Sequence, residues 1–351
     1  MKALYIYSGD RSQKFKGVAG VDYPDTQFYG MNHLYQFGID AEYKEFETYP
    51  LGRFLAKIFG FRIKHLFMYF VARKYDVAFG ISIMYMLFWK KFLRSKTKFI
   101  IFNSVLNRMF IVHKEGSFKR KMLLWFLKEV DGIVFLAKVH MDRVLERAHF
   151  LKDRVFFVPM GVDSKYYKPI YEDREDFILS VGRDNARDYK TVIEVARKMP
   201  NEQFHIVCLP RNIQGNKDIP SNVHVHFNIP LAELQRMYKK AKVLLLIMHN
   251  DTYIDGSDSS GPTVLLEAMA IGLPIISSKK EYLKDYIDHG KDALIVDFYD
   301  TDDIVESIKK LSDASLRKEM AMNARKKVDS VFNTKEMARG ISEVFKKVYA
   351  K

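Results

Sequence analysis

Short apolar runs alternate with amphipathic stretches along the chain, in the order typical of parallel strands covered by helices. The apolar runs predict strands at residues 2–7, 77–83, 98–102, 132–138, 155–163, 177–181, 203–210, 224–230, 243–247 and 274–277. The amphipathic stretches predict helices at residues 27–37, 53–74, 231–241, 262–271, 302–311 and 334–349, with others beginning near 189, 282 and 316. Because strand, glycine-containing loop and helix is the opening of a Rossmann-like unit, we expect the α/β class.

One polar loop, at residues 255–261, leads into a short helix with clear start and stop signals. Proline is preferred at the first helical position, so the helix is expected to begin near Pro262. Good helix formers follow, and Gly272 with Pro274 predicts the end. A buried strand comes directly afterwards, which gives the order loop, helix, tight turn, strand.

The start of this helix is a candidate anion site. A helix N-terminus preceded by small residues leaves backbone N–H groups unpaired, and the macrodipole adds partial positive charge there. Glu267 lies about one turn further in, where a carboxylate can accept two hydroxyl groups of a ribose. The alternative is an ordinary helix cap with a solvated Glu267, and spacing alone favours neither interpretation.

A second candidate phosphate site follows the strand predicted at 177–181. Gly182 begins a turn that carries Arg183 and Arg187, and guanidinium groups chelate phosphate oxygens in pairs. Lys190 lies in the helix beyond the turn, and we expect it to face solvent. The alternative is that both arginines are solvated turn residues.

Composition indicates a soluble globular protein of two domains, since 351 residues with 48% hydrophobic and 28% charged positions can build two cores. The single cysteine, Cys208, excludes an intrachain disulfide and a Cys-rich metal site, and a reducing compartment fits. His224 and His226 share one face of a predicted strand without acidic partners, so we expect a structural role. The N-terminal apolar run is too short for a signal peptide, and no apolar run reaches the roughly 20 residues of a membrane span.

Positive charge is concentrated in the first half of the chain. Residues 1–163 hold 27 Lys and Arg against 15 Asp and Glu, a net +12 of the total +14. Residues 51–128 hold 17 basic residues against Asp76 and Glu115 only, and aromatic residues lie between them. This pattern favours contact with an anionic membrane face, above all through the amphipathic stretch 53–74. The alternatives are a helix packed on the sheet with a basic solvent face, and a nucleic-acid partner, which no recognition motif supports.

The run from Gly261 to Pro274, Gly-Pro-Thr-Val-Leu-Leu-Glu-Ala-Met-Ala-Ile-Gly-Leu-Pro, resembles the signature of retaining, nucleotide-sugar-dependent glycosyltransferases of the GT-B fold, the group 1 or family-4 set. In that family the glutamate matching Glu267 contacts the nucleotide ribose. The family has another glutamate eight positions earlier, which touches the donor sugar, and this chain has Ser259 there. The expected sugar contacts are therefore Asp255 or Asp258 from the same loop, or backbone groups together with Ser259.

The same resemblance implies roles for further residues. The family's Gly-Arg and following Lys bind the donor diphosphate, and Gly182, Arg183 and Arg187 match them, with helix-start N–H groups near Gly261, Thr263 and Val264. The loops after two later strands enclose the base, at Leu209, Asn228 and Ile229. The family's glycine loop corresponds to Gly17 and Gly20. A family histidine near the donor sugar is replaced by Asn103, and the nearest histidine, His113, caps or lines its loop.

We therefore expect the GT-B fold: two Rossmann-like domains facing each other across a cleft, with the C-terminal helix crossing back to the first domain. The first domain, 1–165 with 335–351, would bind the acceptor, and the second, 166–334, the nucleotide sugar. The expected activity is retaining, hexosyltransferase-like and metal-independent, with no cofactor, because arginines and the helix dipole replace a metal and no Asp-x-Asp motif occurs in a suitable loop.

The expected acceptor is a lipid-linked or cell-surface glycan in polysaccharide biosynthesis. The corresponding location is cytoplasmic, peripheral on the inner face of the membrane, without nucleic acid. Two alternatives stay open: a catalytically inactive GT-B scaffold or binding subunit, favoured by Ser259, and a sugar phosphorylase or epimerase on the same fold.

Overall fold

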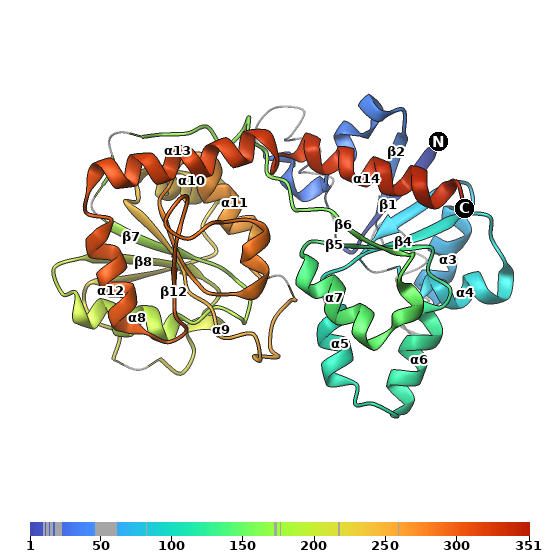
Figure 1. Cartoon of the computed structure of the whole chain (residues 1–351), viewed down its shortest axis with the longest axis horizontal. Coiled ribbons are helices and arrows are strands. Elements are labelled where there is room, and N and C mark those ends of the chain that lie inside the picture. Colours follow the sequence, from blue (N-terminus) through green and yellow to red (C-terminus); the bar gives the residue numbers. More distant parts are fainter. Residues whose placement is uncertain are drawn as a thin grey trace. The chain divides into compact units, whose positions relative to one another are not determined.

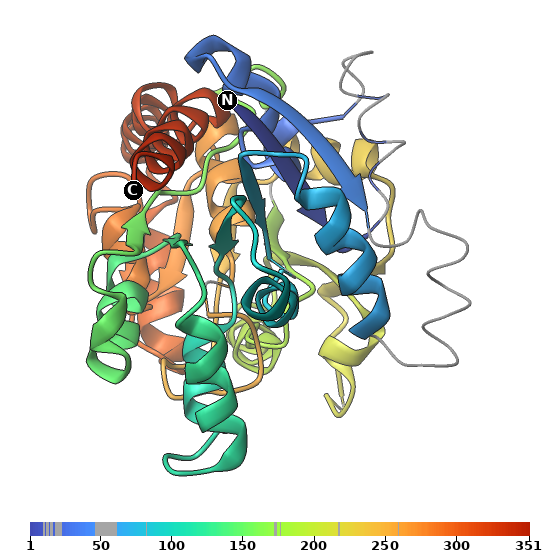
Figure 2. The same cartoon turned by 90° about the vertical axis from the view of Figure 1, so that its right-hand side faces the viewer.

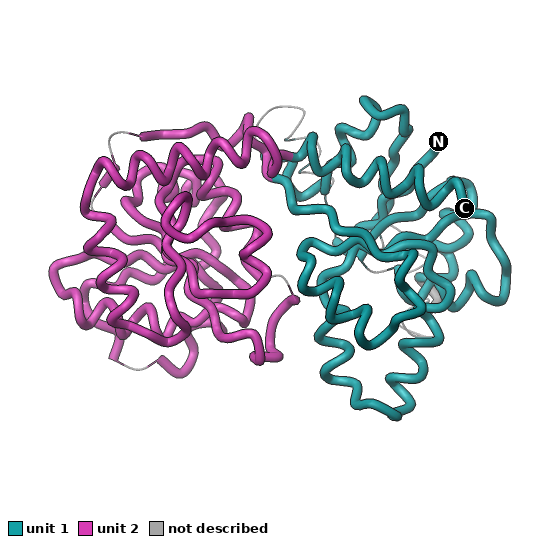
Figure 3. The backbone as a smooth tube through the Cα atoms, viewed as in Figure 1, with its two compact units in different colours: residues 1–161, 334–351 teal, residues 162–333 magenta. Residues whose placement is uncertain are grey.

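The structure is a computed structural model, which describes the chain except for residues 10, 12–13, 15–16, 18–22, 46–61, 82, 172–173, 176, 217 and 259. It divides into two compact units (Figure 3). Unit 1 comprises Met1–Gly161 and Thr334–Lys351, and unit 2 comprises Val162–Asn333. The expected domain boundaries were 165/166 and 334/335. Residues 53–61 of the predicted amphipathic stretch 53–74 lie outside the described residues.

Unit 1 is built on a parallel sheet whose described strands have the order β2-β1-β3-β4-β5-β6. The strands are β1 (Lys2–Tyr7), β2 (Asp40–Glu45), β3 (Val77–Gly80), β4 (Lys98–Phe102), β5 (Gly132–Phe135) and β6 (Val155–Phe157). The helices are α3 (Arg62–Ala72), α4 (Met86–Leu93), α5 (Leu106–Val112), α6 (Phe118–Leu127), α7 (Lys138–Arg147), the 3-10 turn η4 (His149–Leu151) and α14 (Thr334–Tyr349).

The two faces of this sheet are covered by different helices (Figure 1 and Figure 2). Leu4 and Ile6 of β1 belong to the core that includes buried residues of α3, α4 and α6. Because side chains alternate along a strand, Tyr5 points to the other face, where its ring lies 6.3 Å from that of Phe345 on α14. The C-terminal helix therefore completes unit 1, as expected for the GT-B fold.

The helix predicted at residues 27–37 is wrong in type. The structure has two 3-10 helices, η1 (Asp25–Phe28) and η2 (Met31–Phe37), separated by Tyr29 and Gly30, both with positive φ. A Cβ at Gly30 would lie 2.8 Å from the backbone of Ala338, so α14 approaches too closely for any other residue. Asp25 is buried beneath this contact, where it accepts hydrogen bonds from Asn32 and Thr334 and pairs with His33.

Unit 2 has a second parallel sheet, with the order β12-β11-β10-β7-β8-β9 among its described strands. The strands are β7 (Phe177–Val181), β8 (Gln203–Cys208), β9 (Val223–Phe227), β10 (Val243–Leu246), β11 (Ile275–Ser278) and β12 (Leu294–Val296). The helices are α8 (Tyr189–Lys198), α9 (Pro210–Ile213), α10 (Leu231–Lys240), α11 (Pro262–Ile271), the 3-10 helix η5 (Glu281–Asp285), α12 (Thr301–Lys310) and α13 (Ala314–Ser330).

The strand order of unit 2 reverses between β7 and β10, which are neighbours in the sheet. In doubly wound sheets, ligands bind beyond the carboxyl ends of the strands at such a switch point. The loops that leave β7 and β10 carry both candidate phosphate sites. The two Rossmann-like units predicted from the sequence are confirmed. Within the described residues no helix is both long enough and apolar enough to cross a membrane.

Candidate functional site

The loop after β7 places one arginine at the surface and one inside unit 2. Arg183 is exposed, whereas only 5% of Arg187 is accessible. The Nε and Nη1 atoms of Arg187 are buried without a hydrogen-bond partner, and Arg187 forms no ion pair with the described residues. Burial of a guanidinium without a counterion is unfavourable, so this position favours an anionic ligand.

Gly182 makes room for this guanidinium. A Cβ built at Gly182 would lie 2.0 Å from Nε of Arg187, closer than any real contact. Only glycine fits at position 182 while the Arg187 side chain keeps this position. The backbone carbonyl of Gly182 accepts a hydrogen bond of 2.7 Å from the hydroxyl of Tyr189, which holds the turn against the start of α8.

The start of α11 lies close to the same guanidinium. Arg187 pairs with Met248 in an isolated β-bridge, and the hydroxyl of Tyr282 contacts both the sulfur of Met248 and the carbonyl of Ser260. Ser260 precedes Gly261, the N-cap of α11, which has a φ of 107°. The Ser260 hydroxyl is buried and has no hydrogen-bond partner among the residues that the structure describes. Met248 and Tyr282 therefore link the loop of Arg187 to the residues before α11, where the positive end of the helix dipole lies.

A carboxylate ties the polar loop before α11 to the loop after β7. Asp184 accepts hydrogen bonds from the backbone N–H (3.2 Å) and hydroxyl (3.0 Å) of Ser257, and from the N–H of Ala186 (2.9 Å). A Cβ at Gly256 would lie 2.6 Å from Asp184, so this loop needs its glycine. Asp255 and Asp258 both lie on the tied loop, and Ser259 falls outside the described residues.

Glu267 is held by two tyrosines that the sequence analysis did not identify. Its two carboxylate oxygens accept hydrogen bonds from the hydroxyls of Tyr167 (2.9 Å) and Tyr238 of α10 (3.0 Å). Burial raises the pKa of Glu267 to about 7, although both hydrogen bonds lower it. Each carboxylate oxygen keeps a further lone pair, so the tyrosines orient the group without saturating it.

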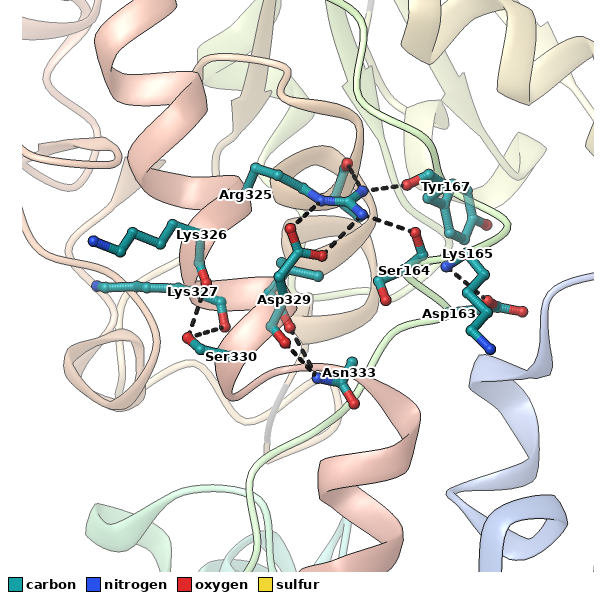
Figure 4. A network of polar contacts seen from close by, with 12 residues as sticks. Asp163, Ser164, Lys165, Tyr167, Arg325, Lys326, Lys327, Asp329, Ser330 and Asn333 are labelled. Atoms are coloured by element: carbon teal, nitrogen blue, oxygen red, sulfur yellow. Dashed lines mark hydrogen bonds and ion pairs between the residues drawn. The ribbon is translucent and has the colours of Figure 1, made fainter.

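The segment that carries Tyr167 is fixed by Arg325 of α13 (Figure 4). The Arg325 guanidinium donates to the backbone carbonyls of Ser164 (3.0 Å), Tyr167 (2.6 Å) and Ala270 (2.6 Å), and it pairs with Asp329. One arginine therefore joins α13, α11 and the segment before β7. The position of the Tyr167 ring, and through it of Glu267, depends on this contact.

The raised pKa of Glu267 predicts how stability depends on pH. The unfolded chain releases this proton near pH 4.5 and the folded protein near pH 7, so the folded state binds more protons between these values. Stability is expected to fall as pH rises through this window, by no more than about 3 kcal/mol, and to level off above it. The Glu267→Gln variant should lack this pH-dependent contribution to stability. The measurement is the difference in urea-unfolding midpoint between wild type and variant from pH 4 to pH 8 (a range chosen to bracket the window); a difference independent of pH would contradict the prediction.

The residues expected around the base lie on two loops, which follow the carboxyl ends of β8 and β9. Leu209 is half-buried and precedes α9, Asn228 is exposed with a φ of 51°, and Ile229 is half-buried. Arg211, which no sequence pattern marks as part of the site, donates to the carbonyl of Arg183 (3.0 Å) and to the side chain of Asn185. The loop after β8 is thereby attached to the loop after β7.

Other predicted residues occupy structural positions. The Asn103 side-chain oxygen accepts the N–H groups of Val105 (3.3 Å) and Leu106 (2.9 Å), so it caps α5, and His113 ends the same helix. Gly17 packs against Tyr23, and Gly20 falls outside the described residues. Thr263 and Val264 are half-buried in the first turn of α11.

The histidines form a stacked group on β8 and β9. Nδ1 of His205 lies 3.0 Å from Nε2 of His226, and the rings of His205 and His224 are 4.9 Å apart. Burial, with the neighbouring imidazoles, lowers the pKa of His205 to about 4. No group of three or more His, Cys, Asp or Glu in the described part of the chain has an arrangement that could hold a metal ion.

Sequence comparisons relate the chain to known glycosyltransferases. Residues 168–327 match the model of the glycosyl transferases of group 1. The chain is 22% identical over 278 residues to the putative glycosyltransferase YtcC of Bacillus subtilis, covering 68% of this chain and 66% of that protein. It is 28% identical over 120 residues to the amylovoran biosynthesis glycosyltransferase AmsK of Erwinia amylovora, covering 34% of this chain and 29% of that one.

A solved structure shares the whole fold. Anabaena HepE in complex with UDP-glucose superposes with a TM-score of 0.67 at 12% identity, covering 98% of each chain. At this identity the likeness establishes the GT-B fold. The aligned parts of YtcC and AmsK amount to less than two thirds of the length of each.

Proposed function

Because residues 168–327 form a domain of the glycosyl transferases of group 1 and the whole chain has the GT-B fold, we propose that this protein transfers a sugar from a nucleotide-diphosphate sugar to a glycan acceptor. The observation that carries the proposal is the buried guanidinium of Arg187, which has two nitrogen atoms without partners beside the start of α11. A diphosphate supplies the negative charge and the acceptor oxygens that this site lacks.

The proposed chemistry is electrostatic. Arg187, the N-terminal N–H groups of α11 and the Ser260 hydroxyl bind the diphosphate and stabilise its charge as it leaves. Arg183 approaches from the surface of the same loop. Glu267 accepts the ribose hydroxyls, and the loop tied by Asp184 brings Asp255 and Asp258 toward the sugar, with Ser259 in the position of the family's first glutamate. The transfer retains configuration and uses no metal ion.

The donor proposed for the first test is a UDP-sugar, since the structural neighbour HepE binds UDP-glucose. The proposed acceptor is a lipid-linked or cell-surface glycan, because AmsK is named for polysaccharide biosynthesis and unit 1 is strongly basic. We place the enzyme at the inner face of the membrane, where an anionic surface attracts such a unit.

A catalytically inactive binding subunit is the alternative, and Ser259 in place of the family's glutamate favours it. The unpartnered Arg187 opposes it. A protein that does not bind a diphosphate has no use for a buried cation, which lowers its stability.

A thermal-shift screen against UDP-, GDP-, ADP- and CMP-sugars without metal tests the proposal. A ligand that binds only the folded state is expected to raise the unfolding temperature, equivalent to about 2.7 kcal/mol at a concentration 100 times Kd. The double variant Arg183→Ala with Glu267→Ala should lose this shift and donor turnover. Lys190→Ala is the matched control, because Lys190 is exposed at the start of α8 and pairs only weakly with Glu194. Full turnover in the double variant would refute the assignment.

A further inference from the structure

Unit 1 has an apolar groove between α4 and α6, whereas the residues of the proposed donor site belong to unit 2. Its lining consists of aromatic and methionine side chains, with a cavity of about 170 Å³: Tyr85, Phe88, Trp89, Met122, Trp125 and Phe126. The volume is smaller than the roughly 300–1,000 Å³ of a pocket for a drug-sized ligand. The shape and chemistry suit a narrow apolar ligand.

The aromatic side chains of this groove are partly exposed. Phe88 is 36% accessible and Tyr85 is 43% accessible. The Phe88 ring nevertheless lies 5.0 Å from the ring of Trp89 and 6.0 Å from the ring of Trp125. Phe92, one turn along α4 and 60% accessible, extends the surface. Contiguous exposed aromatic surface of this kind marks a binding site in a soluble protein.

The groove is surrounded by basic residues. Lys91 lies over the Trp125 ring at 5.0 Å and pairs with Glu129. Five further cations are exposed on or next to the two helices, and none of them has an ion-pair partner within the described residues: Arg94, Lys96, Lys119, Lys121 and Lys128. Aromatic side chains with flanking Lys and Arg are typical of surfaces that sit at a membrane interface.

We propose that this groove receives the hydrocarbon chain of an anionic membrane lipid. The basic residues around it contact the headgroups, and the aromatic walls enclose the first methylene groups of one chain. A second copy of the protein would bring two strongly basic surfaces together, which opposes a dimer through this face. The inference deepens the proposed membrane location of the enzyme and names the site and ligand, but it does not depend on the donor.

The chain contains two tryptophans, Trp89 and Trp125, and both line the groove. Their fluorescence therefore reports on this site alone. The probe is a vesicle of equal parts phosphatidylcholine and phosphatidylglycerol, with or without bromine on the sixth and seventh carbons of the acyl chains. Chain entry should quench the fluorescence by about twofold with brominated lipid and shift the emission to the blue, because the indole rings then contact hydrocarbon.

Phe88→Gln should remove most of this quenching, since it places an amide in the apolar wall. Phe118→Gln is the matched control: Phe118 is the first residue of α6, is 79% accessible and does not line the groove. Both variants should melt like wild type and keep the thermal shift with the nucleotide sugar, which separates this inference from the proposed activity.

Three results would overturn the proposal. The first is vesicle sedimentation without quenching by brominated chains, which means contact with headgroups only. The second is the absence of vesicle binding. The third is equal quenching in wild type and Phe88→Gln.

Discussion

Replacing Arg187 by methionine should abolish stabilisation by the nucleotide sugar and, at the same time, make the unliganded protein more stable. Donor turnover is expected to fall by about 10²–10³-fold, the loss typical of removing one donor to a developing negative charge. The gain in stability should be about 1–2 kcal/mol, because a buried cation without a partner is replaced by an apolar chain of similar length.

Loss of ligand binding together with a gain in the stability of the free protein distinguishes a ligand-binding arginine from a structural one. A structural arginine is bonded in the free protein, as Arg325 is, and its loss lowers stability. The buried Nε and Nη1 atoms of Arg187 have no hydrogen-bond partner in the described part of the chain, so their bonds are expected to form only with the ligand.

Unfolding temperatures with and without the nucleotide sugar, together with kcat/KM, measure both effects. Lys190→Met serves as the control, since replacing a cation by methionine at an exposed position should alter neither quantity. A variant at position 187 that is less stable without ligand, or that keeps the ligand shift, would contradict the assignment.

Gly182→Ala should impair donor binding nearly as much as loss of Arg187, although it adds a single methyl group. The added carbon would lie 2.0 Å from Nε and 2.9 Å from Cδ of Arg187, so the guanidinium must leave its position. The backbone at Gly182 has no positive φ, and alanine is therefore compatible with the turn itself. We expect about a 10²-fold fall in kcat/KM with a cost of about 1–2 kcal/mol in stability.

A double-mutant cycle tests the cause. In an Arg187→Ala background the atoms that the methyl group strikes are absent, so Gly182→Ala should change kcat/KM by no more than about twofold to threefold. An undiminished effect of Gly182→Ala in that background would mean that the glycine acts through its own backbone. The cycle is measured with the donor that gives the largest thermal shift.

The elements of the site that depend on local sequence were predictable. Proline at the first helical position and glycine beyond the last fixed α11 at Pro262–Ile271, and the strand before Gly182 placed the arginine turn. The switch point then follows from the strand order. The type of helix at residues 27–37 was not predictable, because the αL conformation of Gly30 is set by the close passage of α14.

The residues that contact the site from distant parts of the sequence could not be predicted either. Tyr167 and Tyr238 meet Glu267 from positions 100 and 29 residues away, and Asp184 reaches Ser257 across 73 residues. No local pattern marks these residues, since a tyrosine in an apolar stretch and an aspartate in a turn are both common. The difference between Arg183 and Arg187 in burial likewise arises from packing. Arg187 sits beside Met248, and Met248 contacts Tyr282.

The division of unit 1 into two stretches of chain sets the order in which the protein can assemble during translation. Unit 2 is complete once residues 162–333 have been made, but unit 1 still lacks α14 at that point. At about 5–20 residues per second, the ribosome needs roughly 10–30 s for those residues. During this time Phe345 of α14 has not been made, so the face of the first sheet that carries Tyr5 lacks this contact. The nascent first unit therefore lacks α14 on this aromatic surface while the second unit is being made, and chaperone binding is expected to concentrate there.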